Sequence, residues 1–403
     1  MPQQVFVVGV GMTKFEKPGR PTEHAAPWDY PSMVAEAGTA ALDDAGLRFD
    51  QVEVAVASYV YGDSTSGTRA VYELGETGIP VFNVNSNCSS GSNALYLARQ
   101  LLLAGGSDVA LAVGFEKMQP GSLTEAFTDR ESPMRRIREA VESRYPSSGM
   151  PMTLEIFGAA ALEHMERYGT TAEQFGRVAE KNHRHSRDNA RSQFRDVYTL
   201  DEIMDSPGYY GPLTKLMCSP TSDGAAAAVL MTADAVERHG LQAQAIEVLG
   251  QALVTDLPDS FDGSSAITAS GAGLTARAAE AVYEQTGFGP SDIDVIELHD
   301  CFATNELISY EGLGLCGPGE GGALIDAGDA TYGGRWVINP SGGLIAKGHP
   351  LGATGIAQCA ELTWQLRGLA GTRQVEGAAR ALQHNIGLGG SAVVSMYAAP
   401  VGA

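Results

Sequence analysis

The sequence predicts an α/β protein built from two similar halves, with a helical insertion inside the first half. Apolar runs rich in β-branched residues alternate with segments of helical periodicity, which implies a parallel or mixed sheet covered on both faces. A strand–turn–helix unit at 82–104 has a counterpart at 336–367, and this repetition indicates an internal duplication. Residues 115–220 show no strong strand pattern and carry clusters of Met, Pro, Arg and Glu. We therefore interpret them as the insertion.

The first half alternates between short apolar strands and helices. Its β-branched runs predict strands at 5–10, 52–61, 81–84 and 108–114. A helix is expected over 31–46, and a second follows Cys88 and ends at the stop signal Gly105-Gly106. The small residues of 223–231 suit a strand in the packed middle of a sheet.

The insertion and the second half show their own periodicities. Three amphipathic segments of the insertion predict helices at 132–144, 155–168 and 171–188. Apolar runs in the second half predict strands at 246–254, 293–298, 336–339 and 392–397. Helical periodicity recurs at 272–286 and 350–367.

Charge and cysteine content exclude several classes of protein. A formal net charge of −21 over 403 residues argues against nucleic acid and anionic membranes as partners. Five widely spread cysteines without a Cys-x-x-Cys pair indicate reduced thiols and argue against structural zinc. The N-terminus shows no signal-peptide pattern, and no apolar run approaches the roughly 20 residues of a membrane span. We expect a cytoplasmic protein.

Cys88 is the first candidate catalytic residue, because it follows a predicted strand where a helix should begin. The unpaired backbone N–H groups and the dipole of a helix N-terminus favour an anion there, and the thiolate is the nucleophilic form of cysteine. The dipole contributes only about 1 kcal/mol, so a nearby base is still needed. The alternative is a buried structural cysteine at a strand–helix corner.

His299 and Cys301 follow a predicted strand of the second half. In an extended chain both side chains point to one side and Asp300 points to the other. A histidine and a cysteine on one face could serve acid–base chemistry on a substrate. The alternative is a buried packing pair.

The glycine-rich stretch 339–355 contains a third candidate, His349. Pro350 suits the first position of a helix, so we expect His349 at a helix N-terminus, where the ring stays neutral and can act as a base. The many glycines, Gly343 among them, suggest close approach of the backbone to a ligand. The alternative is a glycine-rich connector.

Two further stretches could contact a ligand. The glycines of 383–390 indicate a loop before the last strand, which can aim backbone N–H groups at an anion, whereas His384 in the same stretch favours a structural role. Residues 181–187, which include His183, are the most basic part of the insertion and could contact a phosphate of a nucleotide-tailed ligand. A solvated basic face is the alternative there.

Together these motifs resemble those of thiolases and occur in the same order. The matching segments are Asn87–Gly91, Ser222–Ala228, His299–Phe302, Gly348–Gly355 and Asn385–Gly390. The chain is similar in particular to the sterol carrier protein-type thiolases over nearly its full length. Ordinary thiolases carry Asn-Glu-Ala-Phe where this chain has His299–Phe302, and Cys-x-Gly where it has Asn385–Gly387. The second cysteine therefore looks moved to Cys301, with Asn385 in its former place.

The resemblance implies a thiolase-like fold of two duplicated α/β halves with mixed five-stranded sheets and a helical loop domain. The implied domains are an N-terminal half at 1–114 and 225–240, a CoA-binding loop insertion at 115–224, and a C-terminal half at 241–403. The family pairs its subunits through the strand near 81–86, so we expect a homodimer or homotetramer. We expect no appended lipid-transfer domain.

The resemblance also implies two-step acyl transfer between coenzyme A thioesters. Cys88 would attack the ketone of a 3-oxoacyl-CoA while His349 takes its proton. Cys301 would protonate the departing enolate of acetyl-CoA or propionyl-CoA and then deprotonate an incoming CoA. His349 and His299 would polarise the thioester oxygen, and the N–H groups of Cys88 and Gly387 would cradle the oxyanion.

The implied ligands are acyl-CoA and CoA as substrates, with no metal and no redox cofactor. Candidates for contacts with them are Ser219, His183, Gly343 and His384. Two other functions stay open. One is a thiolase-fold retro-aldolase acting on CoA esters, although such proteins lack the cysteine pair. The other is a non-catalytic scaffold that binds acyl-CoA or lipid.

Overall fold

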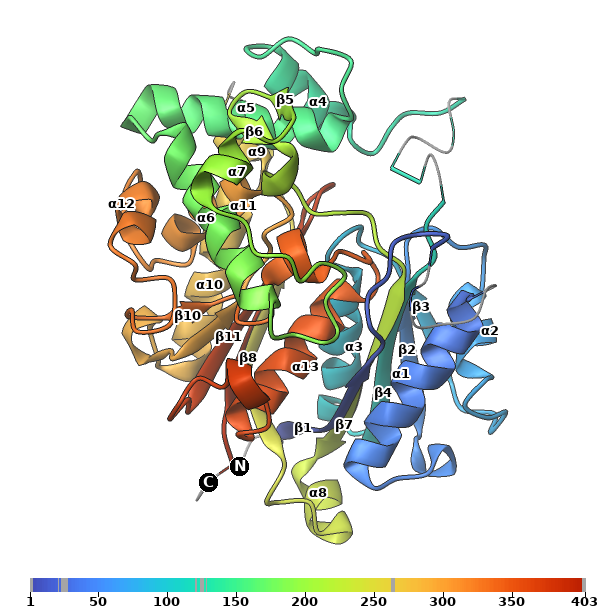
Figure 1. The fold of residues 1–403 in the computed structure, drawn as a ribbon. Helices are drawn as coiled ribbons and strands as arrows, with labels where there is room; N and C mark the ends of the chain where they lie inside the picture. The colour runs from blue at the N-terminus through green and yellow to red at the C-terminus, as the bar shows by residue number, and fades with distance from the viewer. Residues whose placement is uncertain are drawn as a thin grey trace.

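A ten-stranded sheet runs through the protein in the computed structural model, which describes residues 3–20, 22, 28–119, 122–123, 127, 129–261 and 265–400. The strand order is β10-β9-β11-β12-β8-β1-β7-β4-β2-β3 (Figure 1). The strands of the first half are β1 Val5–Met12, β2 Val54–Ser58, β3 Val81–Val84, β4 Val109–Glu116 and β7 Gly224–Thr232. Those of the second half are β8 Ile246–Val254, β9 Val295–Glu297, β10 Val337–Ile338, β11 Arg380–Gly387 and β12 Ser391–Ala398.

The strand pairings confirm the internal duplication. In the first half β1, β7 and β4 are antiparallel neighbours, and β2 and β3 continue from β4 in parallel. In the second half β8, β12 and β11 are antiparallel, and β9 and β10 continue in parallel. The two five-stranded sets are not separate sheets, however. They join where β1 pairs with β8 through Phe6 with Glu247 and Val7 with Ile246.

The helices form layers around this sheet. Their bounds are α1 Tyr30–Ala45, α2 Ser66–Val71, α3 Ser90–Leu103, α4 Arg135–Glu142, α5 Met152–Tyr168, α6 Ala172–Ser186, α7 Leu200–Met204, α8 Ala233–His239, α9 Ala266–Ala269, α10 Ala272–Thr286, α11 Ala303–Gly312, α12 Gly321–Asp326 and α13 Thr354–Leu366. Helices α3 and α13 pack against each other in the core between the two strand sets. Helix α1 covers the other face of the first set, and α10 the other face of the second.

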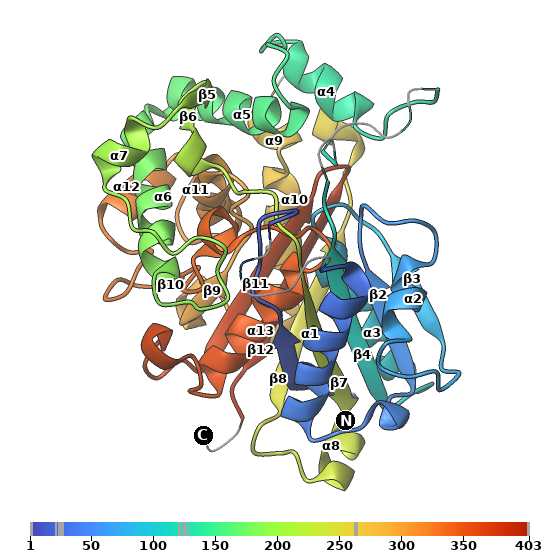
Figure 2. The ribbon, with the colours of Figure 1, turned by 45° about the vertical axis from the view of Figure 1, so that its right-hand side comes forward.

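The insertion is helical, as predicted, and lies over the second half. Helices α4, α5 and α6 match the three predicted segments, and Thr171 begins α6 by accepting a hydrogen bond from the Gln174 N–H. Figure 2 shows this green part of the chain beside α11 and α12, and α6 contacts both of those helices. The insertion also holds a small sheet of β5 (Gly208–Tyr210) and β6 (Leu213–Thr214), which the periodicity did not predict.

Two local predictions were wrong, and two helices were not predicted. Residues 383–387 belong to strand β11 rather than to a loop, because their polar side chains find partners inside the protein. Helix α13 begins at Thr354 rather than at Pro350, since turns occupy the residues between. The segment between β9 and β10 carries α11 and α12, two helices that the sequence analysis did not identify.

Among the described residues, no helix combines the length and apolar character needed to cross a membrane.

Candidate active site

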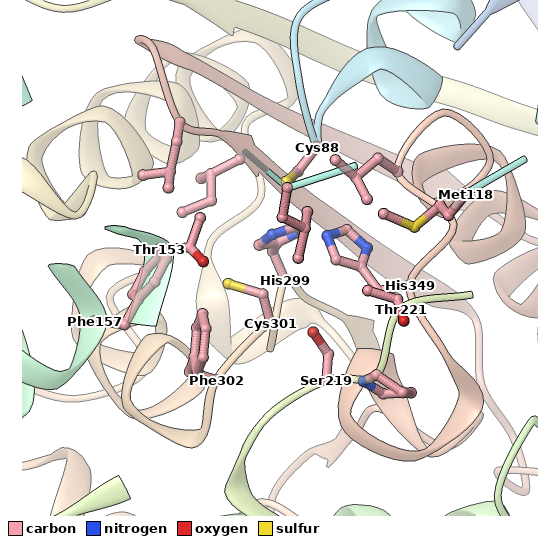
Figure 3. A pocket seen from close by; sticks show the side chains of 15 residues that line it. Cys88, Met118, Thr153, Phe157, Ser219, Thr221, His299, Cys301, Phe302 and His349 are labelled. Carbon is pink, nitrogen blue, oxygen red and sulfur yellow. The ribbon is translucent and has the colours of Figure 1, made fainter. Parts of the chain in front are cut away.

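One pocket brings together four of the five catalytic candidates, Cys88, His299, Cys301 and His349, whereas Gly387 is absent from its lining (Figure 3). Each side chain follows a strand that belongs to a parallel pairing: β3 precedes Cys88, β9 precedes His299 and Cys301, and β10 precedes His349. The site thus lies beyond the carboxyl ends of parallel strands, the usual place for ligands in α/β sheets. The other lining residues are mostly apolar: Met118, Leu123, Thr153, Phe157, Ser219, Pro220, Thr221, Phe302, Leu351, Ile386 and Leu388.

Cys88 lies in the turn between β3 and α3, two residues before the helix begins. Its Sγ and one ring nitrogen of each of His299 and His349 lie within 4.8 Å of one another. Burial, reinforced by the nearby Glu116 carboxylate, raises the pKa of the Cys88 thiol to about 12. Burial therefore outweighs the small preference for the thiolate that the helix N-terminus provides. Cys88 rests as a thiol and needs a base to become a nucleophile.

His349 has the hydrogen bonding of such a base. Its Nδ1 lies 2.8 Å from Thr354 Oγ1, and that hydroxyl donates its own proton to the Pro350 carbonyl at 3.0 Å. The hydroxyl must therefore accept from the ring, which places the His349 proton on Nδ1. The His349 Nε2 is buried without a partner and is free to accept a proton.

The neutral state of His349 has a different cause from the one predicted. Helix α13 begins five residues after His349, so the effect of its dipole on the His349 ring is weak. Burial, helped by the positive charge of Lys347, lowers the pKa of His349 to about 3. The ring is therefore neutral at every pH at which the protein would work.

His299 has the opposite arrangement of ring nitrogens. Its Nδ1 lies 2.8 Å from the side-chain amide nitrogen of Asn385, which has only protons to offer. The His299 proton therefore lies on Nε2. Burial and the nearby His349 and His384 lower the pKa of His299 well below its usual value, so the ring is neutral. The His299 and His349 rings meet edge to face with their centroids 5.2 Å apart. At Nε2, His299 is a hydrogen-bond donor and His349 is an acceptor.

Cys301 is only 6% exposed and lines the same pocket. Burial, with the neighbouring Cys88 and Asp300, raises its pKa well above the usual range, so it too rests as a thiol. The expected extended geometry was incomplete, because β9 ends at Glu297, before His299. The chain beyond the strand is held instead by the Ser219 N–H, which donates to the Cys301 carbonyl at 2.9 Å.

Gly387 ends β11 against the Cys88 turn. A Cβ at this position would lie 2.1 Å from the Ser86 carbonyl oxygen and 2.7 Å from Ser89 Oγ, so only glycine allows this approach. Its neighbours Ile386 and Leu388 line the pocket.

The substrate-contact candidates divide into two groups. Ser219 lines the catalytic pocket, and it also lines an adjoining groove together with His183, Lys17 and Lys215. His183 is buried, with its Nε2 3.0 Å from the Leu216 carbonyl, so it is not part of a solvated basic face.

Gly343 and His384 lie elsewhere. Gly343 has φ +59°, and a Cβ there would lie 2.1 Å from a carboxylate oxygen of Asp300, so this glycine makes room for Asp300 rather than for a ligand. His384 is fully buried with its Nε2 2.9 Å from Thr275 Oγ1, and it is absent from the pocket lining. The structural reading of His384 fits this position.

Sequence reasoning assigned no role to Glu116, a fully buried carboxylate at the end of β4. It accepts backbone N–H groups of Val60, Tyr61 and Gly352 at 3.2, 2.8 and 3.0 Å, and so ties the two halves together beside Cys88. Burial raises its pKa to about 7. A glutamate ending an apolar strand was the available signal.

The trio of Cys88, His299 and His349 has sulfur and imidazole donors of the kind that zinc accepts. These are the residues that could hold a metal. The expectation of a metal-free site therefore stays a prediction, which metal analysis of the purified protein would test.

Comparison with known proteins agrees with these features. A family model described as "Thiolase, N-terminal domain" matches residues 5–234, and "Thiolase C-terminal domain-like" matches residues 263–398. Sterol carrier protein 2 from Oryctolagus cuniculus is 58% identical over 395 residues, which cover 98% of this chain and 72% of that protein. The Homo sapiens protein of the same name is 55% identical over 396 residues, with the same coverage. An acetyl-CoA acetyltransferase from Methanothermobacter thermautotrophicus is 37% identical and covers 98% of this chain and 99% of itself.

Solved structures share the fold at low sequence identity. A structure titled "Ltp2-ChsH2(DUF35) aldolase" superposes with a TM-score of 0.81 at 23% identity, over 99% of this chain and 98% of that one. Human mitochondrial 3-ketoacyl-CoA thiolase in complex with CoA gives a TM-score of 0.71 at 18% identity, over 98% of both chains. At these identities the structures show a common fold and leave the reaction to the site.

Proposed function

This chain belongs to the thiolase family, and we propose that it is an acyl-CoA acyltransferase that reversibly cleaves 3-oxoacyl-CoA by thiolysis. The observation that carries this proposal is the meeting of a thiol, Cys88, with a neutral histidine whose Nε2 is unpartnered, His349. A second thiol, Cys301, and a histidine N–H donor, His299, share the same pocket. Acyl transfer through a covalent intermediate needs these four roles.

The first half-reaction forms the acyl-enzyme. His349 Nε2 takes the Cys88 proton, and the thiolate forms a bond to the 3-oxo carbon of the substrate. The bond between C2 and C3 then breaks, and its electron pair leaves as the enolate of acetyl-CoA or propionyl-CoA. The His299 Nε2–H donates to the enolate oxygen, and the Cys301 thiol gives its proton to C2.

The second half-reaction returns every group to its starting state. The Cys301 thiolate takes the proton of an incoming CoA thiol, and the CoA sulfur attacks the acyl group on Cys88. The bond from Cys88 to the acyl carbon breaks, and protonated His349 returns the proton to the Cys88 thiolate. No redox step occurs, and protons and electrons balance over the cycle.

The groove beside the pocket supports CoA binding by the insertion, residues 115–224. It contains Lys17 and Lys215, whose positive charges suit the phosphates of CoA, and it meets the catalytic pocket at Ser219. The relatives named sterol carrier protein 2 support a role in lipid- or sterol-related acyl-CoA metabolism, and we propose that this role is the degradation of fatty acids or sterol side chains. A cytoplasmic location remains a prediction.

Strand β3 supports the proposed assembly as a homodimer or homotetramer. It is the edge strand of the first half, and its Phe82 is 41% exposed. An exposed edge strand with an aromatic side chain is a site where a second copy can pair. Light scattering at micromolar concentration tests the assembly, and a monomer mass would contradict it.

The experiment that tests the reaction is acylation by acetyl-CoA followed by peptide mass mapping. We expect one acetyl group on Cys88, no label in Cys88→Ala, and thiolysis of acetoacetyl-CoA by the wild type. A label on Cys301 would reverse the two thiol roles. Absence of any label together with absence of thiolysis would favour the retro-aldolase or the non-catalytic scaffold.

A panel of straight, 2-methyl-branched and sterol side-chain 3-oxoacyl-CoAs, assayed in both directions, then identifies the acyl group. The same panel separates a degradative preference from a biosynthetic one.

A further inference from the structure

A chain of hydrogen bonds reaches His299 from the backbone of α13. We propose that Asn385 and Ser92 are positioning residues that hold the His299 proton on Nε2, so that His299 remains a hydrogen-bond donor to the substrate. The catalytic consequence of this proposal rests on the function proposed above. The proton position itself is a property of the resting protein.

This series of hydrogen bonds starts at the Gly355 carbonyl, which can only accept a hydrogen bond. The side-chain amide of Gln383 lies 2.7 Å from this oxygen, so its NH₂ group must face Gly355. The Gln383 oxygen then faces Tyr397, whose hydroxyl donates to it at 2.6 Å. Both ends of the Gln383 amide are thus satisfied in one orientation only.

The next link passes through Ser92 in helix α3. The second proton of the Gln383 amide points to Ser92 Oγ at 2.8 Å, so this hydroxyl accepts there. The Ser92 proton is then free for the neighbouring Asn385 Oδ1 at 2.9 Å. This contact fixes which end of the Asn385 side chain is oxygen, and its NH₂ group faces His299 Nδ1 at 2.8 Å.

The network is tightly built. Asn385 and Ser92 are fully buried, and Gln383 is 1% exposed, so no bulk water competes for these groups. A Cβ at Gly355 would lie 2.2 Å from Ser92 Oγ and 2.7 Å from Asn385 Oδ1, so a glycine is needed for α13 to approach the network. The network joins α3, α13, β11 and the His299 segment, which come from both halves of the protein.

The side chains of asparagine and aspartate differ in whether they donate or accept the hydrogen bond with the His299 Nδ1. An amide can only donate through its NH₂ group, whereas a carboxylate accepts and draws a histidine proton onto Nδ1. Asn385→Asp should therefore move the His299 proton to Nδ1 with little change in side-chain volume. The Nε2 lone pair would then face the substrate oxygen and could not stabilise the enolate.

The test reads the His299 ring by ¹⁵N NMR in the protein without substrate, with its signals assigned by their loss in His299→Ala. We expect a proton on Nε2 alone in the wild type, a proton on Nδ1 in Asn385→Asp, and a mixture in Ser92→Ala. A wild-type proton on Nδ1, or an Nδ1 that stays bare in Asn385→Asp, would overturn the proposal whatever the enzyme activity is.

Steady-state thiolysis of acetoacetyl-CoA gives the second readout. Loss of one oxyanion donor typically lowers kcat by about 10²–10³-fold, and we expect this for Asn385→Asp with KM little changed. In Ser92→Ala, kcat should fall by a smaller factor, because part of the population keeps the His299 proton on Nε2.

Ser270→Ala is the matched control. Ser270 is a serine 1% exposed whose hydroxyl donates to the Ile267 carbonyl at 2.8 Å, outside the network. It should keep both the His299 spectrum and kcat. If Asn385→Asp shows the proton on Nδ1 but retains wild-type kcat, the catalytic meaning of the network is wrong.

Discussion

The two copies of the strand–turn–helix unit face each other across the active site, and they differ in how they present their reactive group. In the first copy, β3 leads to Cys88 and α3 begins two residues later, at Ser90. In the second copy, a buried turn over Gly343–Lys347 and a further turn separate β10 from α13, and His349 lies between them. The duplicated scaffold places both groups at the carboxyl ends of strands, and local sequence makes one a thiol, the proposed nucleophile, and the other an imidazole, the proposed base.

The edges of the two copies differ as well. Strand β3 is partly exposed along its length, whereas β10 is buried and its Ile338 N–H donates to the Ala330 carbonyl, in the segment between α12 and β10. One edge is therefore available to another copy of the chain, and the other is covered by the chain itself. A symmetric fold has become an asymmetric molecule through additions to one half.

The strongest test of the comparison removes one reactive group from each copy. Cys88→Ala should abolish thiolysis and leave the fold intact, because alanine fits the same turn. His349→Ala should lower thiolysis by about 10³–10⁴-fold, since the Cys88 pKa of about 12 leaves almost no thiolate without a base. Steady-state kinetics on acetoacetyl-CoA and the rate of Cys88 alkylation by iodoacetamide measure both effects. Unchanged alkylation in His349→Ala would contradict its role as base.

The second prediction concerns Cys301, which belongs to the second copy alone. Cys301→Ala should still form the acyl-enzyme on Cys88 from an activated thioester, because His349 remains. Overall thiolysis should fall by at least about 10²-fold, the usual scale for a general acid–base group. His384→Ala is the comparison variant and should lose much less, since His384 bonds Thr275 away from the pocket. Near wild-type thiolysis by Cys301→Ala would contradict the assignment.

The third prediction sharpens the link between the copies through Glu116. Its pKa is raised from 4.5 to about 7, so the folded protein binds a proton that the unfolded chain releases in that range. The stability that this group contributes is full below pH 4.5 and is lost as the pH rises through 7. The loss should be about 3 kcal/mol, since each pKa unit corresponds to about 1.4 kcal/mol.

Glu116→Gln should flatten the pH dependence of the free energy of unfolding by that amount. Urea titrations at pH 5, 6, 7 and 8 measure the free energy of unfolding, provided that its dependence on urea concentration, the m-value, stays constant. Parallel curves for the two proteins would show that Glu116 does not titrate between these values.

The smallest expected effect comes from Thr354→Val. This change keeps the shape of the side chain and removes the acceptor of the His349 Nδ1–H at 2.8 Å. A neutral hydrogen bond contributes about 0.5–1.5 kcal/mol, so kcat should fall by about 3–10-fold. A loss as large as that of His349→Ala would mean that Thr354 itself takes part in the chemistry.

Local patterns predicted the elements whose role is decided within a short stretch of chain. The apolar strand before Cys88, the helix after it and the three insertion helices are confirmed within a few residues. Strand β11 escaped, because Gln383, His384 and Asn385 look like loop residues until their buried partners are known. Polarity alone cannot distinguish an exposed polar residue from a buried one with a partner.

The pKa values and hydrogen-bond partners of the site residues could not be predicted for a related reason. The helix N-terminus at Cys88 was visible in the sequence, but its small effect on the pKa is exceeded by burial, which depends on the whole fold. Asn385 and His299 lie 86 residues apart, and their contact had no local signal. Gly343 was read as a ligand contact, whereas its neighbour in space is Asp300.

The pairing of β4 with β7 sets the order in which this protein can fold during synthesis. Residues 117–223 separate these two strands, so the central pairing of the first half waits until the insertion has left the ribosome. Closure of so long a loop costs little extra free energy, because that cost grows only with the logarithm of loop length, but it slows folding. A nascent chain that ends before β7 exposes the unpaired edge of β4, an apolar strand prone to aggregation. Chaperone binding should therefore be strongest for nascent chains that end between β4 and β7.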